Sequence, residues 1–320
     1  MRKIWVDTDP GVDDTVAIAM LFEAEDVDII GMSSIFGNVT VDLTTKNAKL
    51  LLEAQERTEI PIARGANYPL YIPLDTSPFV HGDNGLGNMP LTEPTMPEFP
   101  LAAPQAIINA IMESPHEIIL MPIGPLTNIA MAYLMEPRIA GIVKEVVIMG
   151  GAIHVPGNIT PVAEANFFHD PHAAQIVLKA GWPITLAGLD VCGHTSMIPN
   201  ALMEKITGTD KPLSPFIKGA LPFYQDFIRT FGIHDRVDFP DALAAAYLLD
   251  PDIFTIEKIP VFVETEGSCL GQSVPVLNGK WYEDMNDTRH FKADESISEI
   301  NVLLKENPQQ FFDLVESLLT

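Results

Sequence analysis

Short hydrophobic runs alternate with stretches of helical periodicity along most of the chain. The runs expected to form buried strands cover residues 4–7, 29–35, 118–121, 145–149, 184–187 and 259–263. The stretches expected to form helices cover residues 15–25, 44–54, 103–113, 125–135, 171–180 and 240–249. This alternation predicts an α/β fold in which a mostly parallel central sheet carries helices on both faces. Ligands of such sheets bind beyond the carboxyl ends of the strands.

Two longer segments interrupt this alternation. Residues 68–100 are rich in proline and glycine, and we expect a long loop there that either covers a functional site or is disordered. Residues 213–238 are a second candidate for a mobile cover. Aromatic residues at the spacing found there are typical of a core, with stacking on a ligand as the alternative. No repeat or linker divides the chain, so we predict a single domain over residues 1–320.

Four aspartates crowd the end of the first predicted strand, at Asp7, Asp9, Asp13 and Asp14. Two carboxylates about 5 Å apart repel each other by roughly 3 kcal/mol at an effective dielectric constant near 20. We therefore expect a positive charge to offset them, and a hard divalent cation bound by oxygen atoms is the simplest candidate. One or two of these aspartates could instead cap the following helix. Capping does not account for all four.

Composition narrows the possible partners. Nineteen basic against 43 acidic residues give a net charge of −24, which repels nucleic acid and anionic lipid surfaces but not a neutral nucleoside or sugar. Only Cys192 and Cys269 occur, so neither a disulfide framework nor a zinc pattern is present. The first residues do not resemble a signal peptide, and Pro122 and Gly124 break the longest apolar run. We predict a cytoplasmic protein with no nucleic acid or membrane partner.

Further amides and carboxylates follow later strands, at Asn38, Asn158, Glu164 and Asn166, and Asp241 stands at the start of a predicted helix. Each has an ordinary explanation as a turn or a helix start. Together they are expected to converge on one end of the sheet. Such groups bind vicinal hydroxyls without the positive charge that a phosphate demands, so the pattern suits a metal ion together with a ligand such as ribose.

The opening octad Asp7-Thr8-Asp9-Pro10-Gly11-Val12-Asp13-Asp14 resembles the signature of the nucleoside hydrolases, the inosine–uridine preferring group and its relatives. The resemblance spans nearly the whole chain in the right order. Its later parts are Gly37-Asn38-Val39, residues 81–87, residues 124–128, Met149-Gly150-Gly151, Asn158 with Glu164-Ala165-Asn166, and Asp241-Ala242-Leu243.

The resemblance implies a calcium enzyme that cleaves the N-glycosidic bond of ribonucleosides with water. It implies that Ca²⁺ is held by Asp9, Asp14, Asp241 and the backbone carbonyl of Ile123, and that Asp9 is the general base. The residues implied to line the ribose pocket are Asp13, Asn38, Met149, Asn158, Glu164, Asn166 and Asp241. A homotetramer or homodimer and a role in nucleoside salvage are also implied.

One position departs from the family pattern. Many members carry histidine just before the last metal-binding aspartate, where it acts as an acid, and purine-preferring relatives carry tryptophan there. This chain has Pro240, which can neither donate a proton nor stack on a base. His81 and His234 are the remaining acid candidates, of which we favour His81. Candidates for stacking on the base are Phe239, Tyr224 and Phe227.

Two other functions compete with this interpretation. A haloacid-dehalogenase-like phosphatase also opens with Asp-x-Asp after a first strand, and would use Asp7 as nucleophile, Asp9 as acid–base and magnesium as metal. Gly11 and the scarcity of lysines for binding phosphate oppose it. The second alternative is a calcium-dependent protein that binds nucleosides or ribose without turnover. Pro240 is the one feature that favours it.

Overall fold

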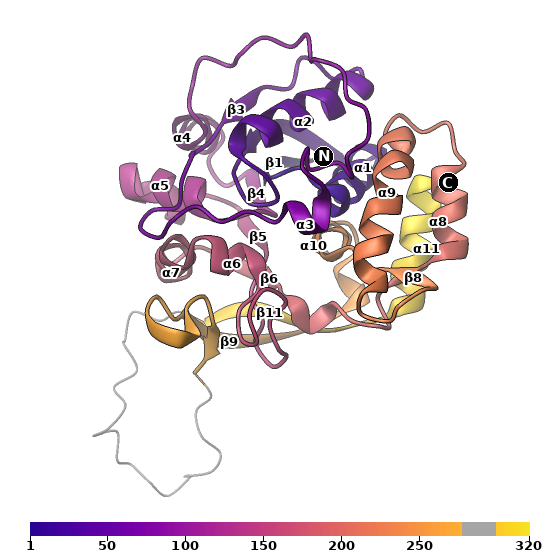
Figure 1. The fold of residues 1–320 in the computed structure, drawn as a ribbon. Coiled ribbons are helices and arrows are strands. Elements are labelled where there is room, and N and C mark those ends of the chain that lie inside the picture. Colours follow the sequence, from indigo (N-terminus) through magenta and orange to yellow (C-terminus); the bar gives the residue numbers. More distant parts are fainter. Residues whose placement is uncertain (277–298) are drawn as a thin grey trace, which may run out of the picture.

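Within the residues that the structure describes, nine strands form a central sheet (Figure 1). The structure is a computed structural model that describes residues 1–276 and 299–320. The strands of the sheet are β1 (Arg2–Thr8), β2 (Val27–Ser34), β3 (Ile62–Arg64), β4 (Ile118–Pro122), β5 (Glu145–Met149), β6 (Ile184–Ala187), β9 (Phe254–Val263), β10 (Ser273–Pro275) and β11 (Glu299–Glu306). Their order is β10-β9-β11-β6-β5-β4-β1-β2-β3. All neighbours pair in parallel except β9, which is antiparallel to β11 and β10. The predicted mostly parallel α/β sheet is confirmed.

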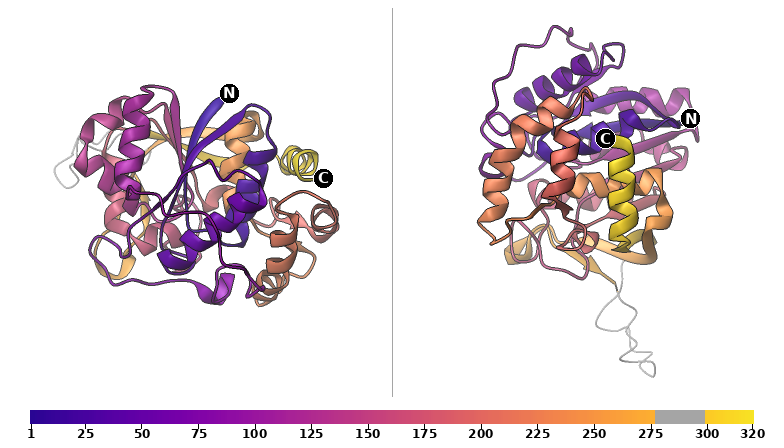
Figure 2. Two further views of the ribbon diagram at one scale, coloured as in Figure 1. Left: turned by 90° about the horizontal axis from the view of Figure 1, so that it is seen from above. Right: turned by 90° about the vertical axis from the view of Figure 1, so that its right-hand side faces the viewer.

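Helices cover both faces of this sheet (Figure 2). One face carries α1 (Val12–Glu23), α2 (Val41–Ala54), α8 (Asn200–Thr207), α9 (Ser214–Arg229), α10 (Pro240–Leu249) and α11 (Pro308–Leu319). The other carries α4 (Ala103–Glu113), α5 (Thr127–Met135) and α7 (Pro171–Lys179). Shorter elements are α3 (Pro78–His81), α6 (Ala165–His169), the 3-10 turns η1 (Pro137–Gly141), η2 (Leu189–Val191), η3 (Pro251–Ile253) and η4 (Gly267–Cys269), and the two-stranded sheet of β7 (Ile198–Pro199) and β8 (Arg236–Val237).

The strand sequences are hydrophobic without interruption because both faces of the sheet are buried. In β1, Ile4 and Val6 pack into the core on the α1 side, and Trp5 packs into the core on the α4 side. Residues Ile119 and Leu120 of β4 divide between the two cores in the same way. Successive side chains along a strand point to opposite faces of the sheet. A sheet that is covered on both faces therefore needs apolar residues at successive positions, not only at every second one.

All six predicted strands and all six predicted helices are present, with shifted ends. The most important shift is at α1, which begins at Val12 rather than at residue 15, so that Asp13 and Asp14 lie in its first turn. The two predicted covering segments are not entirely loops: residues 68–100 contain α3, and residues 213–238 contain α9 and β8. Within the described ranges, none of the helices is both long and apolar enough to cross a membrane.

Candidate active site

The chain turns sharply between β1 and α1, and Asp14 holds that turn together. Its carboxylate accepts hydrogen bonds from the Thr8 hydroxyl (2.6 Å), the Gly11 amide (2.8 Å) and the Asn38 side-chain amide (3.0 Å). Asp14 therefore does act at the helix start, as the capping alternative supposed. Because all three donors are neutral, this role leaves its negative charge without a cationic partner.

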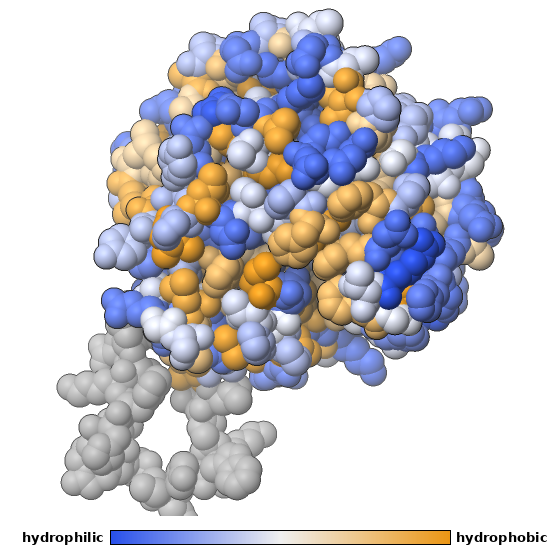
Figure 3. Space-filling view, in the orientation of Figure 1, coloured by the Kyte–Doolittle hydropathy of each residue, from blue (hydrophilic) through white to orange (hydrophobic). Residues whose placement is uncertain are grey.

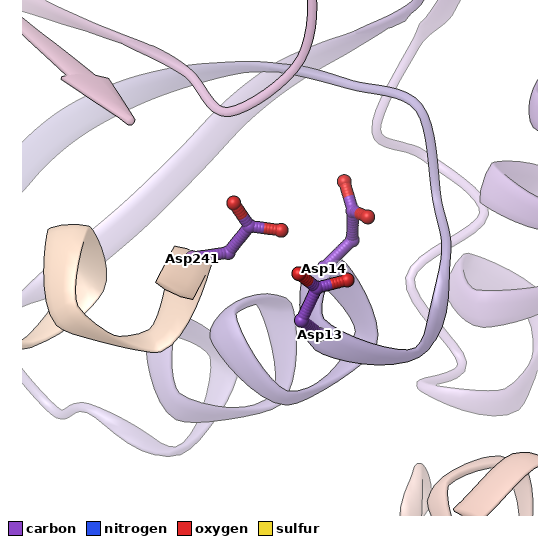
Figure 4. A group of neighbouring side chains, drawn as sticks. All are labelled: Asp13, Asp14 and Asp241. Carbon is purple, nitrogen blue, oxygen red and sulfur yellow. The ribbon is translucent and has the colours of Figure 1, made fainter. Parts of the chain in front are cut away.

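A second helix brings another carboxylate to the same place. Asp241 lies in the first turn of α10, which packs against α1. Oxygen atoms of Asp13, Asp14 and Asp241 all lie within 4.8 Å of one another (Figure 4). Three carboxylates from two helix starts thus share one buried space, a donor set typical of a hard metal ion.

Asp9 lies at the carboxyl end of β1 in a close-fitting backbone cradle. One carboxylate oxygen, Oδ2, accepts a hydrogen bond from the Asn38 amide at 2.7 Å. The other, Oδ1, is buried and has no hydrogen-bond partner among the described residues, and the same is true of Asp13 Oδ1. A Cβ atom on Gly37 or on Gly124 would overlap the Asp9 carboxylate, so glycine is required at both positions. Such unpaired buried oxygens fit the binding of a cation or of a polar ligand.

Burial and mutual repulsion make these carboxylates hard to ionise without a cation. Burial raises the pKa of Asp9 well above its usual value, and the charge of Asp14 adds to this effect. Burial likewise raises the pKa of Asp13 and of Asp14 to about 6. The pKa of Asp241 is raised well above normal by burial and then by the neighbouring aspartates. A divalent cation would reverse these shifts because it favours the charged forms. The residues present therefore fit a metal ion.

A cavity of about 240 Å³ opens directly beside this cluster. Most of the residues that the sequence predicted for the site line it; the exceptions are Asp14, the acid candidate His234, and the stacking candidate Phe239, which is buried against Tyr224. The predicted residues in its wall are Asp9, Asp13, Asn38, His81, Ile123, Met149, Asn158, Glu164, Asn166 and Asp241. Its described lining includes no lysine or arginine. The cavity is thus suited to a neutral polyhydroxylated ligand rather than to a phosphate.

Glu164 and Asn166 fix the cavity wall opposite α1. The Glu164 carboxylate caps α6 by accepting from the amides of Asn166 (2.8 Å) and Phe167 (3.1 Å), and it also accepts from the Gly151 amide (2.9 Å). Burial raises its pKa to about 7. The Asn166 side-chain amide donates to the carbonyl oxygens of Ile123 (3.1 Å) and Met149 (3.2 Å). These bonds join the ends of β4 and β5 at the cavity.

The two histidines proposed from the sequence have different surroundings. His81, at the end of α3, is buried in the cavity wall, whereas His234 is exposed and is not part of the lining. The Nδ1 atom of His81 accepts from the Val12 amide at 3.3 Å and lies 3.7 Å from Asp13 Oδ1. Burial lowers the pKa of His81 to about 4, so its imidazole is neutral at pH 7, with the proton on Nε2.

Aromatic side chains form the outer part of the cavity. Phe79 of α3 and Phe231, just after α9, are 57% and 66% exposed at its mouth, and hydrophobic side chains gather on this face (Figure 3). Tyr224 stacks on His81 with ring centroids 5.5 Å apart and on Phe239 at 5.8 Å. The spacing of the aromatic residues in 213–238 predicted that they pack in the core, with stacking on a ligand as the alternative. Tyr224 does both kinds of packing, because it is buried in the core and also lines the cavity.

Two further residues that line the cavity, Phe79 and Asp238, were not identified from the sequence.

Gly124→Ala is expected to disrupt the site without unfolding the protein. The new Cβ would overlap Asp9 Oδ1 and would lie 2.8 Å from Ile35 Cγ2, so Asp9 would have to move. We expect metal affinity to fall at least about tenfold, as measured by calorimetric titration. Gly141→Ala is the matched control, because no atom of the described part of the chain lies within 4 Å of its Cβ position. Equal metal affinity in the two variants would show that the close fit of Asp9 against Gly124 does not support metal binding.

Glu164→Ala is expected to destabilise the fold by at least about 3 kcal/mol, because three backbone amides lose their acceptor and a buried unpaired donor costs about 1–3 kcal/mol. Glu164→Gln keeps one acceptor oxygen and should lose about 1 kcal/mol. Urea unfolding followed by circular dichroism measures both values. An alanine variant as stable as the glutamine variant would show that these hydrogen bonds do not support α6.

Comparison with known proteins agrees with this site. Residues 4–313 match the family model of the inosine-uridine preferring nucleoside hydrolase. The chain is 37% identical over 287 residues to probable uridine nucleosidase 2 of Oryza sativa subsp. japonica, covering 88% of this chain and 85% of that relative. A solved plant nucleoside hydrolase is similar with a TM-score of 0.91 at 30% identity, over 100% of this chain and 99% of the other. A purine-preferring ribonucleoside hydrolase from Gardnerella vaginalis gives a TM-score of 0.87 at 26% identity, over 99% and 98%.

The family match covers nearly the whole chain, and the carboxylate cluster and cavity agree with the chemistry of nucleoside hydrolysis. The chain therefore belongs to the inosine-uridine preferring nucleoside hydrolase family.

Proposed function

We propose that this nucleoside hydrolase uses Ca²⁺ and Asp9 to cleave the N-glycosidic bond of ribonucleosides, giving free base and ribose. The observation that carries the proposal is Asp9 Oδ1, a buried carboxylate oxygen without a partner in the wall of the cavity. Such an oxygen is available to take a proton from a water molecule inside the cavity.

The proposed metal ligands are Asp9, Asp14, Asp241 and the carbonyl oxygen of Ile123. Asp13, whose carboxylate lies within 4.8 Å of those of Asp14 and Asp241, would add a fourth negative charge to the same space. When bound, Ca²⁺ would supply the positive charge that these buried carboxylates lack. Its preference for six to eight oxygen ligands suits an all-oxygen donor set completed by the ribose hydroxyls.

The proposed ribose pocket consists of Asp13, Asn38, Met149, Asn158, Glu164, Asn166 and Asp241. Departure of the base leaves positive charge on the ribose, in a transition state that resembles an oxocarbenium ion. Carboxylate and amide oxygens held in fixed positions stabilise that charge. The hydrogen bonds that anchor Glu164 and Asn166 to the backbone provide the rigidity on which this stabilisation depends.

In the proposed reaction Asp9 takes a proton from water as the water oxygen attacks C1′. Attack on the face opposite the leaving base inverts the anomeric carbon, and no covalent intermediate is required. The outer, aromatic part of the cavity would hold the base. The prediction that His81 supplies a proton to the base stays a prediction, and the low pKa of its buried imidazole favours a neutral hydrogen-bond donor at pH 7.

The base preference is tested by incubating the protein with inosine, adenosine, guanosine, uridine and cytidine in phosphate-free buffer. Free base and ribose should appear in equal amounts, and the rates should rank the bases. The relatives include a probable uridine nucleosidase and a purine-preferring enzyme, so both classes of base belong in the panel.

A binding protein without turnover is the second candidate function. Pro240 favours it, because this residue lines the cavity just before Asp241 and has no proton to donate. Nucleoside binding by calorimetry, without release of base over a day, would identify this case. The homodimer or homotetramer implied by the family stays a prediction, which analytical ultracentrifugation tests.

A further inference from the structure

Asp238 is an acidic group in the cavity wall that is not among the residues proposed to bind the metal or the ribose, and it precedes Pro240 by two residues. The same lining includes apolar side chains, among them Met197, Ile228 and Ile233. Asp238 is partly exposed, but its Oδ1 atom is inaccessible to solvent and has no hydrogen-bond partner within the described parts of the chain. Leaving a buried carboxyl oxygen unpaired costs about 1–3 kcal/mol. A ligand that hydrogen bonds to Asp238 would remove this cost.

Asp238 is held rigidly between two elements. Val237 before it pairs with Ile198 in the two-stranded sheet, and Phe239 after it is buried against Tyr224. The Asn200 amide donates to the Asp235 carbonyl at 2.9 Å and fixes the start of the same strand. A side chain on such a support keeps its position when a substrate enters, as an acid–base group must.

The surroundings of Asp238 favour its protonated form. Burial, and then the negative charge of Asp13, raise its pKa to about 7, and Glu306 adds a smaller effect in the same direction. The charge of Asp238 in turn raises the pKa values of Tyr224 and Cys192, and neither of these groups brings a positive charge at neutral pH. A carboxyl group with a pKa near the working pH is suited to general acid catalysis.

We propose that Asp238, in the wall of the same cavity as Asp9, is the general acid that protonates the leaving base. This inference rests on the proposed function. As the C1′–N bond breaks, its electron pair moves to the base, and the Asp238 carboxyl proton passes to a nitrogen or a carbonyl oxygen of the base. The water oxygen bonds to C1′ and its proton passes to Asp9. Solvent then carries one proton from Asp9 back to Asp238, so the sum of the reaction is nucleoside plus water giving base plus ribose.

His81 is the other candidate acid in the cavity wall, and its Nδ1 atom faces Val12 and Asp13. Burial lowers the pKa of His81 to about 4, so its imidazole is neutral at pH 7, whereas the pKa of Asp238 is raised to about 7. The two candidates can be separated by replacing each in turn and by changing only the leaving group.

The test compares a nucleoside with p-nitrophenyl β-D-ribofuranoside, whose leaving group departs without being protonated. Asp238→Asn should lower kcat on the preferred nucleoside at least about 100-fold, the usual contribution of a general acid. It should change kcat on the nitrophenyl riboside less than threefold. Asp235→Asn is the matched control, because it makes the same substitution at a nearby exposed aspartate, and it should keep both activities. Thermal unfolding checks that each variant is folded.

Other results would overturn the assignment. Equal losses on both substrates would mean that Asp238 positions the ribose or supports the fold, and no loss on either would remove it from the reaction. A loss confined to nucleosides in His81→Gln, with Asp238→Asn active, would make His81 the acid. If the wild-type protein cleaves neither substrate, the proposed function fails, and this inference fails with it.

Discussion

An Asp9→Asn variant is expected to lose at least about 1,000-fold in kcat on nucleosides while remaining folded. General base catalysis contributes about 10²–10⁴-fold, and an amide cannot take a proton from water. The amide oxygen can still accept the hydrogen bond from the Asn38 backbone, so the local structure should survive. Steady-state kinetics on the preferred nucleoside measure this loss.

The same substitution should make the metal-free protein more stable. Burial raises the pKa of Asp9 well above normal, so its ionised form opposes folding when no cation is present. Asp210→Asn removes an exposed charge and is the matched control, expected to change neither activity nor unfolding temperature. Activity of the Asp9→Asn variant within tenfold of the wild type would exclude Asp9 as the base.

With a chelator present, thermal stability is expected to fall as the pH rises from about 4 to about 6. The pKa values of Asp13 and Asp14 are raised by burial from 3.8 to about 6, so the folded state binds more protons than the unfolded state in this interval. Unfolding free energy then decreases with rising pH. Below pH 4 these groups are protonated in both states, and their contribution becomes constant.

Calcium should oppose this loss at neutral pH. A ligand at about 100 times its Kd stabilises the folded state by about 2.7 kcal/mol, a rise on the order of 5 °C in Tm. Differential scanning fluorimetry from pH 4 to pH 7.5, with EDTA and with CaCl₂, measures both effects. A chelated protein that gains stability over the same interval would contradict the buried carboxylate cluster.

The sequence predicts the inner half of the site well because the signal there is local. Asp9, Asp13 and Asp14 lie close together in sequence where β1 passes into α1, and the carboxyl ends of β1, β4 and β5 meet at one edge of the sheet. The rule that ligands bind at that edge is enough to bring Asn166 and Asp241 toward them. The structure confirms the fold class and brings these residues into one cavity wall.

The outer half could not be predicted in the same way, because it depends on long-range packing. α9 contains Pro222 in its interior, which obscured its helical pattern. Its aromatic residues reach the cavity because α9 packs beside α1 and α3, an arrangement that no local pattern encodes. Asp238 looked like a loop residue. Its fixed position in the cavity wall depends on the pairing of β8 with β7, which lie far apart in sequence.

Metal-dependent hydrolysis of nucleosides by this protein is tested most directly by one measurement. Purified protein is treated with EDTA, assayed for ribose release from the preferred nucleoside, and assayed again after CaCl₂ is added in excess. We predict that release stops with the chelator and returns with calcium, with one free base formed for each ribose. Release that continues unchanged in EDTA would contradict the proposed calcium site, and a protein that binds calcium yet releases no ribose from any nucleoside would contradict the proposed turnover.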